Sequence, residues 1–312
     1  MIDINTYIEQ LNWHKEPYGL YEPIAYTLSG EGKRIRPRLC LLGALAVTNM
    51  SDEELQQRVL PAALALEVFH NFTLLHDDVM DRADTRRGRA TVWKRWNENT
   101  AILSGDEMMI EAYKLLENVS ADKLAGVFSM FNRMASEICE GQQLDMEYEK
   151  WKDEDCQMDD YIRMIRLKTA VLLATTLKIG AYLANGTKQE QEALYQYGIK
   201  IGLAFQIQDD WLDCYGDKAT FGKPIGGDIR EGKKTWLRLS AVHHPNCQRD
   251  ALMSKDYDVV IAEYDRLGVK TSAVEAIQSL THQAMKHLDC LGNNAITEQL
   301  KTIAINLINR TK

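Results

Sequence analysis

Proline is scarce and unevenly placed in this chain of 312 residues. Four of the six prolines lie before residue 62, and none occurs between Pro61 and Pro224. Because proline breaks helix interiors, its absence removes the main obstacle to long helices over about half of the chain. Strict alternation of apolar and polar residues is also hard to find there, which argues against β-strands.

Other absences narrow the class of protein. The six cysteines contain no C-x-x-C pair, so we expect free thiols and a cytoplasmic location. The first ten residues, MIDINTYIEQ, lack the pattern of a signal or transit peptide, and no apolar run is long enough to span a bilayer. The formal net charge of -8 argues against nucleic acid and anionic membranes as partners. We therefore expect no nucleic-acid binding and no stable membrane insertion.

Helix-forming residues are abundant instead. Leu, Ala, Met, Glu, Gln and Lys fill the proline-free half, and apolar residues recur there at i, i+3, i+4 and i+7. The pattern predicts long helices over residues 60–81, 121–150, 159–184 and 188–214. Gly/Lys-rich loops are expected at 216–234, and amphipathic helices after them. With no linker or repeat in sight, we expect a single all-α domain over 1–312, a bundle of long helices around a central cavity.

Two acidic clusters have the same spacing, i, i+1 and i+4. They are Asp77, Asp78 and Asp81, and Asp209, Asp210 and Asp213. Each follows a largely apolar run, so each is expected at the C-terminal end of a buried helix, where the helix dipole favours a cation. Carboxylates at this spacing repel one another unless a cation lies between them. Ligands that are all carboxylates favour Mg²⁺, which completes its shell with phosphate oxygens.

Basic residues lie near both clusters in the sequence. Arginines follow the first cluster, lysines follow the second, and a third basic group occurs in GEGKRIRP at 30–37. Arginine binds phosphate in a bidentate way, and glycine allows close approach of the backbone to an anion. The chain contains no G-x-x-x-x-G-K-[ST] sequence, so a P-loop is not supported. The pattern predicts a phosphate group held between Mg²⁺ and these cations.

Six segments, in this order, resemble the trans-isoprenyl diphosphate synthases of the polyprenyl synthetase family, of the short-chain farnesyl or geranylgeranyl type. They are GEGKRIRP (30–37), HNFTLLHDDVMDRADTRRG (70–88), GQQLD (141–145), LKTA (167–170), FQIQDDWLD (205–213) and GKPIGGDIREGKKT (222–235). Glu31 stands where the family usually has a glycine. The resemblance implies the isoprenoid synthase type I fold and the condensation of isopentenyl diphosphate with an allylic diphosphate, which releases pyrophosphate.

The resemblance also implies roles for single residues. Asp77, Asp81 and Asp209 would bind three Mg²⁺ ions on the allylic diphosphate, supported by Asp78, Asp210 and Asp213. Further contacts to that diphosphate would come from Arg86, Lys168, Lys223 and Lys233. Isopentenyl diphosphate would contact Lys33, Arg36, His70, Arg87 and Phe205. The residues at the reacting carbon would be Lys168, Thr169 and Gln206. Gln142 and Asp145 would line the same cavity, and Asp228 would match an outer acidic position.

The product length is a separate hypothesis. Phe72 lies five residues before Asp77, which is about 7–8 Å along a helix at about 1.5 Å per residue. Its ring would form the floor of the cavity that holds the growing prenyl chain, and the small residue Thr73 lies beside it. Phe69, one turn further from the aspartates, would form a second floor. In the family an aromatic residue at this position goes with short products, so we expect fifteen to twenty carbons. A homodimer and small-molecule isoprenyl diphosphates are the partners that the resemblance implies.

Two other functions stay open at this point. A type I terpene cyclase also ionises a diphosphate with Mg²⁺, but it usually pairs one aspartate cluster with an N-S-E-type motif, whereas this chain has two full clusters. A non-catalytic subunit of a heteromeric prenyl synthase is the second alternative. Such subunits tend to lose aspartates, and this chain has kept all six.

Overall fold

The computed structural model describes residues 2–30, 32–216 and 225–308. The helices before residue 150 are α1 (Ile4–Gln10), α2 (Tyr18–Leu28), α3 (Ile35–Val47), α4 (Asp52–Arg58), α5 (Leu60–Met80), α6 (Val92–Arg95), α7 (Glu98–Leu116) and α8 (Ala121–Tyr148). After it come η1 (Asp153–Asp155), α9 (Met158–Ile165), η2 (Arg166–Ala170), α10 (Val171–Leu183), α11 (Lys188–Tyr215), α12 (Gly227–Glu231), α13 (Trp236–Val242), α14 (Arg249–Leu252), α15 (Tyr257–Arg266), α16 (Val269–His287), η3 (Asp289–Leu291) and α17 (Ala295–Ile308). Two short strands, β1 (Thr85–Arg86) and β2 (Arg89–Ala90), form a hairpin.

The chain divides into two compact units. Unit 1 comprises residues 1–130 and 176–191, and unit 2 comprises residues 131–175 and 192–312. Each aspartate cluster therefore belongs to a different unit.

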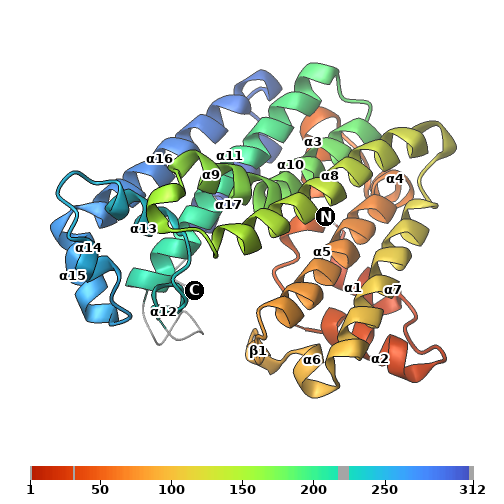
Figure 1. The fold of residues 1–312 in the computed structure, drawn as a ribbon. Coiled ribbons are helices and arrows are strands. Elements are labelled where there is room, and N and C mark those ends of the chain that lie inside the picture. The colour runs from red at the N-terminus through yellow and green to blue at the C-terminus, as the bar shows by residue number, and fades with distance from the viewer. Residues whose placement is uncertain (1, 31, 217–224, 309–312) are drawn as a thin grey trace. The chain divides into compact units, whose positions relative to one another are not determined.

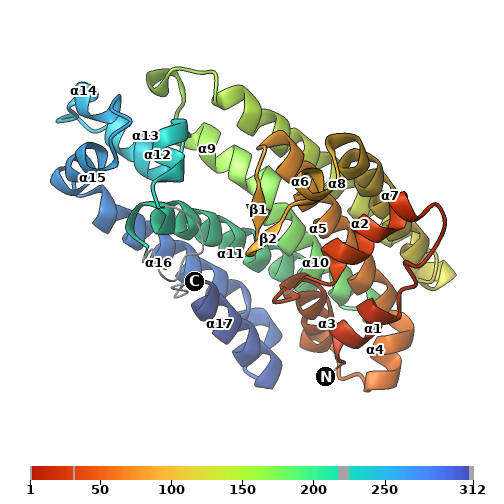
Figure 2. The same ribbon diagram turned by 90° about the horizontal axis from the view of Figure 1, so that it is seen from below.

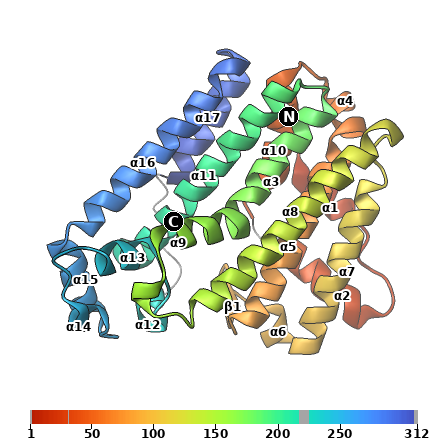
Figure 3. The same ribbon diagram turned by 45° about the horizontal axis from the view of Figure 1, so that its top comes forward.

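The core helix of unit 1 is α5. Pro61 lies in its first turn, where the missing amide hydrogen costs nothing. Side chains are buried on nearly all sides of the helix between Leu60 and Asn71, because α3 and α7 pack against it (Figures 1 and 3). The helix ends at Met80, with Asp81 as its C-cap. The first acidic cluster thus occupies the last turn of a buried helix, as predicted.

The β1–β2 hairpin follows α5 at once. Thr85 pairs with Ala90 and Arg86 with Arg89, and the two residues of the turn, Arg87 and Gly88, have φ values of 52° and 74°. Positive φ at both turn positions is the requirement of the tightest hairpin turns, and glycine meets it without strain. Figure 2 shows the hairpin beside α5 and α6, also of unit 1. The tight turn folds the hairpin back, so that Arg86 and Arg87 lie close to the end of α5.

In unit 2 the long helix α11 carries the second cluster in its last two turns. The hydroxyl of Tyr197 on α11 donates to the backbone oxygen of Leu300 at 2.7 Å, which joins α11 to α17 (Figure 3). A separate apolar cluster around Leu237, Val260 and Tyr264 holds α13 and α15 together. This cluster supports α12 and the start of α13. Both are hydrogen-bonded to the end of α11, α12 through Asp213 and α13 through Asp210.

The all-α fold is confirmed, and three of the four predicted long helices match α5, α8 and α11 closely. The segment 159–184 differs, because a π-helical turn, η2, interrupts it. The segment 216–234, predicted as loops, contains the short helix α12. Among the described residues no single helix is long and apolar enough to cross a membrane; α4 and α5 reach that length and composition only together, across a bend of 59°.

Candidate active site

The first acidic cluster contains carboxylates in different environments. Asp78 is buried and accepts a hydrogen bond from Nε of Arg86 at 2.6 Å, whereas Asp77 is half-buried and Asp81 is exposed. Burial raises the pKa of Asp78 to about 6 although Arg86 opposes it, and the neighbouring carboxylates Asp77 and Asp81 add to the rise. Asp78 therefore anchors the hairpin, while Asp77 and Asp81 are the more accessible of the three.

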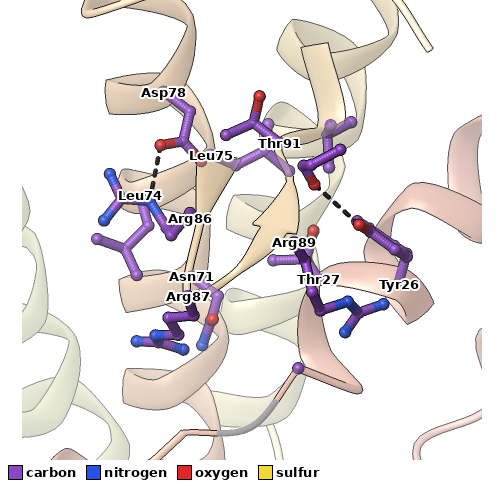
Figure 4. Close-up of a pocket in the computed structure, with 13 residues that line it drawn as sticks. Tyr26, Thr27, Asn71, Leu74, Leu75, Asp78, Arg86, Arg87, Arg89 and Thr91 are labelled. Atoms are coloured by element: carbon purple, nitrogen blue, oxygen red, sulfur yellow. Dashed lines mark hydrogen bonds and ion pairs between the residues drawn. The ribbon is translucent and has the colours of Figure 1, made fainter. Parts of the chain in front are cut away.

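A small pocket lies between the hairpin, α2 and α5 in unit 1. Figure 4 shows that Arg86 points to Asp78 while Arg87 lies beside Asn71 of α5. Arg89 stacks over the ring of Tyr26 at 3.9 Å, and the Tyr26 hydroxyl donates to the backbone oxygen of Ala90 (Figure 4). No sequence pattern pointed to Tyr26, because a single tyrosine outside the recognised motifs has no distinguishing spacing.

The predicted isopentenyl diphosphate site is partly assembled in unit 1. A side chain at Gly32 would lie 3.2 Å from Nη1 of Arg87, so the loop before α3 touches the hairpin. Burial lowers the pKa of Arg36 to about 10, although Glu67 opposes this. Nε of Arg36 is buried without a hydrogen-bond partner among the described residues. A buried guanidinium nitrogen without a partner is costly, and an anionic ligand would satisfy it.

His70 is buried on α5 in the same region. Its pKa is lowered well below the usual value, first by burial and then by the positive charges of Arg36, Arg87 and Arg86. The imidazole is therefore neutral at physiological pH and can donate only one hydrogen bond. A neutral donor beside several cations fits a site for phosphate oxygens, where it adds a hydrogen bond without adding repulsion.

Arg34 has an internal role. Its backbone is left-handed, with φ of 45°, and its side chain is buried. The guanidinium donates to Glu67 at 2.9 Å and also to the backbone oxygens of Leu28 and Gly30. These bonds hold the loop that carries Lys33 and the start of α3, where Arg36 lies. Lys33 is exposed, and it has no described contact that tests its predicted role.

The second acidic cluster in unit 2 is held by a hydrogen-bond network. Asp210 is buried and accepts from the Tyr161 hydroxyl at 2.7 Å, from the backbone N–H of Trp236 at 2.9 Å and from Gln206 at 3.3 Å. Burial raises the pKa of Asp210 to about 7 against these bonds, and Asp209 adds to the rise. Asp209 itself is half-buried. As in the first cluster, the second aspartate is the anchor.

The third aspartate of this cluster binds the start of α12. Asp213 is buried and accepts from the backbone N–H groups of Gly227 and Asp228 at 3.2 and 3.0 Å. Burial, together with Asp213 and Asp210, raises the pKa of Asp228 to about 8. Lys233 forms ion pairs with Glu231 at 3.2 Å and Asp228 at 3.9 Å. The site is thus crowded with carboxylates, and a divalent cation would relieve their repulsion.

The π-helical turn η2 brings the predicted catalytic residues together. Lys168 donates to Asp145 of α8 at 2.6 Å, and the Thr169 hydroxyl donates to Oε1 of Gln206 on α11 at 3.2 Å. Gln206 in turn donates to Asp210, so one chain of hydrogen bonds runs from η2 to the acidic cluster. Single π-helical turns are frequent at functional sites because they redirect side chains.

The predicted product-length residues stack on one face of α5. The rings of Phe69 and Phe72 lie 5.4 Å apart, and Phe72 meets His76 edge-on at 4.7 Å. Phe69 is buried, Phe72 is half-buried, and the Thr73 hydroxyl donates to the backbone oxygen of His70.

The predicted residues thus form two groups. Unit 1 holds the first aspartate cluster with Arg36, His70, Arg86 and Arg87, and unit 2 holds the second cluster with Lys168, Thr169, Gln206 and Lys233. Phe205 is half-buried on α11. Lys223 lies outside the described residues. In the described part of the chain, no three His, Cys, Asp or Glu side chains are arranged to hold a metal by themselves.

Comparison with known proteins gives one consistent result. The family model of polyprenyl synthetases matches residues 17–266. A short chain isoprenyl diphosphate synthase from Methanocaldococcus jannaschii is 44% identical over 72% of this chain and 66% of its own length, and a geranylgeranyl pyrophosphate synthase from Geoglobus acetivorans is 34% identical over 98% and 96%. A crystal structure from Corynebacterium glutamicum, a geranylgeranyl pyrophosphate synthase complexed with isoprenyl diphosphate and magnesium, has a TM-score of 0.86 at 29% identity and covers 98% of this chain and 97% of its own. The chain therefore belongs to the polyprenyl synthetase family.

Proposed function

We propose that this trans-prenyltransferase adds isopentenyl diphosphate to an allylic diphosphate until the chain has twenty carbons, and releases geranylgeranyl diphosphate. The family catalyses the condensation of isopentenyl diphosphate with allylic diphosphates, and several relatives are named as geranylgeranyl diphosphate synthases. Twenty carbons is the upper end of the range predicted from the sequence. The observation that carries the proposal is that both aspartate clusters lie at the C-terminal end of a long helix, and that in each the first aspartate is half-buried and the second is buried.

Mg²⁺ fits the residues present. The donors are carboxylate oxygens, which hard cations prefer, and each cluster gathers three aspartates whose charges a divalent cation would offset. Asp77, Asp81 and Asp209 would hold three ions, which would supply positive charge for the diphosphate leaving group. Asp78, Asp210 and Asp213 instead hold neighbouring segments against the two helices, through Arg86 of the hairpin, Trp236 of α13 and Gly227 of α12.

The remaining side chains serve the reaction through charge and orientation. When the allylic C–O bond breaks, pyrophosphate leaves with the bonding electron pair, and Arg86, Lys168, Lys223 and Lys233 stabilise its charge. The oxygen dipoles of Thr169 and Gln206 face the allylic cation. The double bond of isopentenyl diphosphate attacks this cation, and the proton lost afterwards goes to the departing pyrophosphate. No side-chain nucleophile takes part.

The second diphosphate binds to the basic group of unit 1. Lys33, Arg36, His70 and Arg87 contact its oxygens, and Phe205 packs on the isopentenyl group. The buried, unpartnered Nε of Arg36 and the lowered pKa of His70, caused first by burial, support this assignment. The proposal requires the two units to act as one catalytic domain, which agrees with a family match that runs through both of them. A homodimer stays a prediction from the family.

Incubation with isopentenyl diphosphate, Mg²⁺ and each of dimethylallyl, geranyl and farnesyl diphosphate tests the activity. All three starters should give the same twenty-carbon product, resolved by chromatography after dephosphorylation. A terpene cyclase would leave isopentenyl diphosphate unconsumed, and a non-catalytic subunit would show no turnover by the isolated chain. Either result would refute the proposal.

Phe72→Ala tests the product length. Removal of the ring opens the space along α5, so the share of products longer than twenty carbons should rise several-fold. Phe128→Ala is the matched control, because it removes the same ring from α8, where Phe128 packs against Tyr113 of α7. An unchanged product distribution in Phe72→Ala would mean that another element forms the floor.

A further inference from the structure

Gly105 on α7 has no conformational reason to be a glycine. It lies in the interior of a helix and is buried, and its φ is not in the left-handed region. Glycine in a helix interior is less stable than alanine by about 1 kcal/mol. A different constraint must therefore oppose a larger residue here.

The imidazole of His76 on α5 occupies the space beside Gly105. A Cβ added at Gly105 would lie 2.3 Å from Nε2 and 2.5 Å from Cδ2 of His76. Nε2 also lies 3.1 Å from the backbone oxygen of Ile102, one turn before Gly105, and 3.8 Å from Oδ1 of Asp106. The ring is therefore seated on the backbone of α7, and even a methyl group at residue 105 would displace it.

The other side of this imidazole contacts Phe72. The two ring centroids are 4.7 Å apart at 67°, an edge-on contact between residues i and i+4 of α5. Phe69 contacts Phe72 from one turn below, at 5.4 Å. Phe72 thus has an aromatic neighbour on each side along the helix, and the neighbour nearer to the aspartates is fixed by α7. In close-packed interiors the loss of one such neighbour frees the side chain to change rotamer.

We propose that Gly105 and His76 are positioning residues for product length: α7 seats the His76 imidazole, and the imidazole holds the Phe72 ring across the path of the growing chain. The inference rests on the proposed function, because it takes Phe72 as the floor. It adds to that function a determinant of product length on a second helix, α7. Displacement of His76 removes the support of Phe72 and lets the chain grow further.

Gly105→Ala is the first test. The ratio of products longer than twenty carbons to the twenty-carbon product should rise roughly three- to ten-fold. The rate of the first condensation, measured with dimethylallyl diphosphate, should stay within about two-fold, because the reacting groups are not moved. Gly19→Ala on α2 is the matched control, since a Cβ there meets nothing within 4 Å, and its product ratio should equal that of the wild type.

The double variant Phe72→Ala/Gly105→Ala decides whether the effect passes through Phe72. If it does, the double variant gives the same products as Phe72→Ala alone, because the ring that Gly105 positions is already gone. A general loosening of the fold would instead lengthen the products further. The inference is overturned by an unchanged ratio in Gly105→Ala, or by equal effects of Gly105→Ala with and without Phe72.

These outcomes are separate from a failure of the proposed function. Wild-type turnover of isopentenyl diphosphate tests the proposed function. Phe72→Ala tests whether the Phe72 ring limits the chain length, and the product ratio of Gly105→Ala tests whether His76 and α7 hold that ring in place. A crystal structure of Gly105→Ala in which the Phe72 ring keeps its contact with His76 would overturn the inference even without an assay. A thermal melt close to that of the wild type checks that the variant is folded.

Discussion

At the scale of single residues, Asp153 is the anion of a buried ion-pair group in unit 2. Its carboxylate lies 3.2 Å from Nζ of Lys234 and accepts two bonds from Arg238, at 2.7 and 2.9 Å. All three side chains are almost completely buried. Burial by itself would raise the pKa of Asp153, but the bonds from Arg238 and the charge of Lys234 outweigh it and lower the pKa below its usual value.

Asp153→Asn should destabilise the protein by about 3–5 kcal/mol, because it leaves two buried cations without an anion. Denaturant unfolding measures the difference. Glu298→Ala removes an exposed ion pair with Lys301 on α17 and should cost less than about 1 kcal/mol. Equal losses in the two variants would contradict the argument.

The same carboxylate gives a pH dependence. A carboxyl whose pKa is lower in the folded state stabilises the fold above its unfolded pKa, which is about 4 for aspartate. The stabilisation is lost as the pH falls through the lower, folded value. The stability difference between wild type and Asp153→Asn should therefore be constant above about pH 5 and shrink below about pH 4. A difference that grows on acidification would contradict the lowered pKa.

At the scale of elements, the π-helical turn η2 is the one that positions two of the predicted catalytic side chains, Lys168 and Thr169. It interrupts a helix that sequence periodicity predicts as continuous, and it directs Lys168 to α8 and Thr169 to α11. Gly141 of α8 allows the close packing, because a Cβ there would lie 2.3 Å from the backbone nitrogen of Lys168. The turn depends on this packing, which is why local sequence rules do not predict it.

Thr169→Val should lower kcat about 10- to 100-fold, which corresponds to the loss of one buried hydrogen bond worth about 1–3 kcal/mol. The side chain keeps its shape, but Oε1 of Gln206 loses its donor. KM for both substrates should change little, because the dipoles act on the cation that forms during the reaction. Thr281→Val on α16, which removes a bond to the backbone oxygen of Ile277, should leave kcat unchanged.

At the scale of the whole molecule, the catalytic proposal needs both units. Asp77 and Asp209 belong to different units, and each is the accessible neighbour of a buried anchor. If Mg²⁺ ions on one diphosphate connect the two clusters, Asp77→Ala and Asp209→Ala act on the same step. Each single variant should lower kcat by about three orders of magnitude, and the double variant should lose little more than either, because residues that act together are not additive.

Mg²⁺ titrations of these variants complete the test. Chelation should abolish wild-type turnover, and added Mg²⁺ should restore it, while both single variants should need more of the ion. Losses that simply multiply in the double variant would show that the clusters act independently and would contradict a shared diphosphate.

The sequence by itself determined the helical class, because proline is absent where the long helices lie and the apolar residues repeat with the helical period. It also determined the two acidic clusters and their place at helix ends, since that depends only on spacing along α5 and α11. Only the tertiary structure decided which aspartates became buried anchors, that Arg34 supports its loop internally, and that His76 is seated on α7 beside Phe72. These outcomes depend on contacts between residues far apart in the chain, and no local pattern encodes which side chain a neighbouring helix will bury.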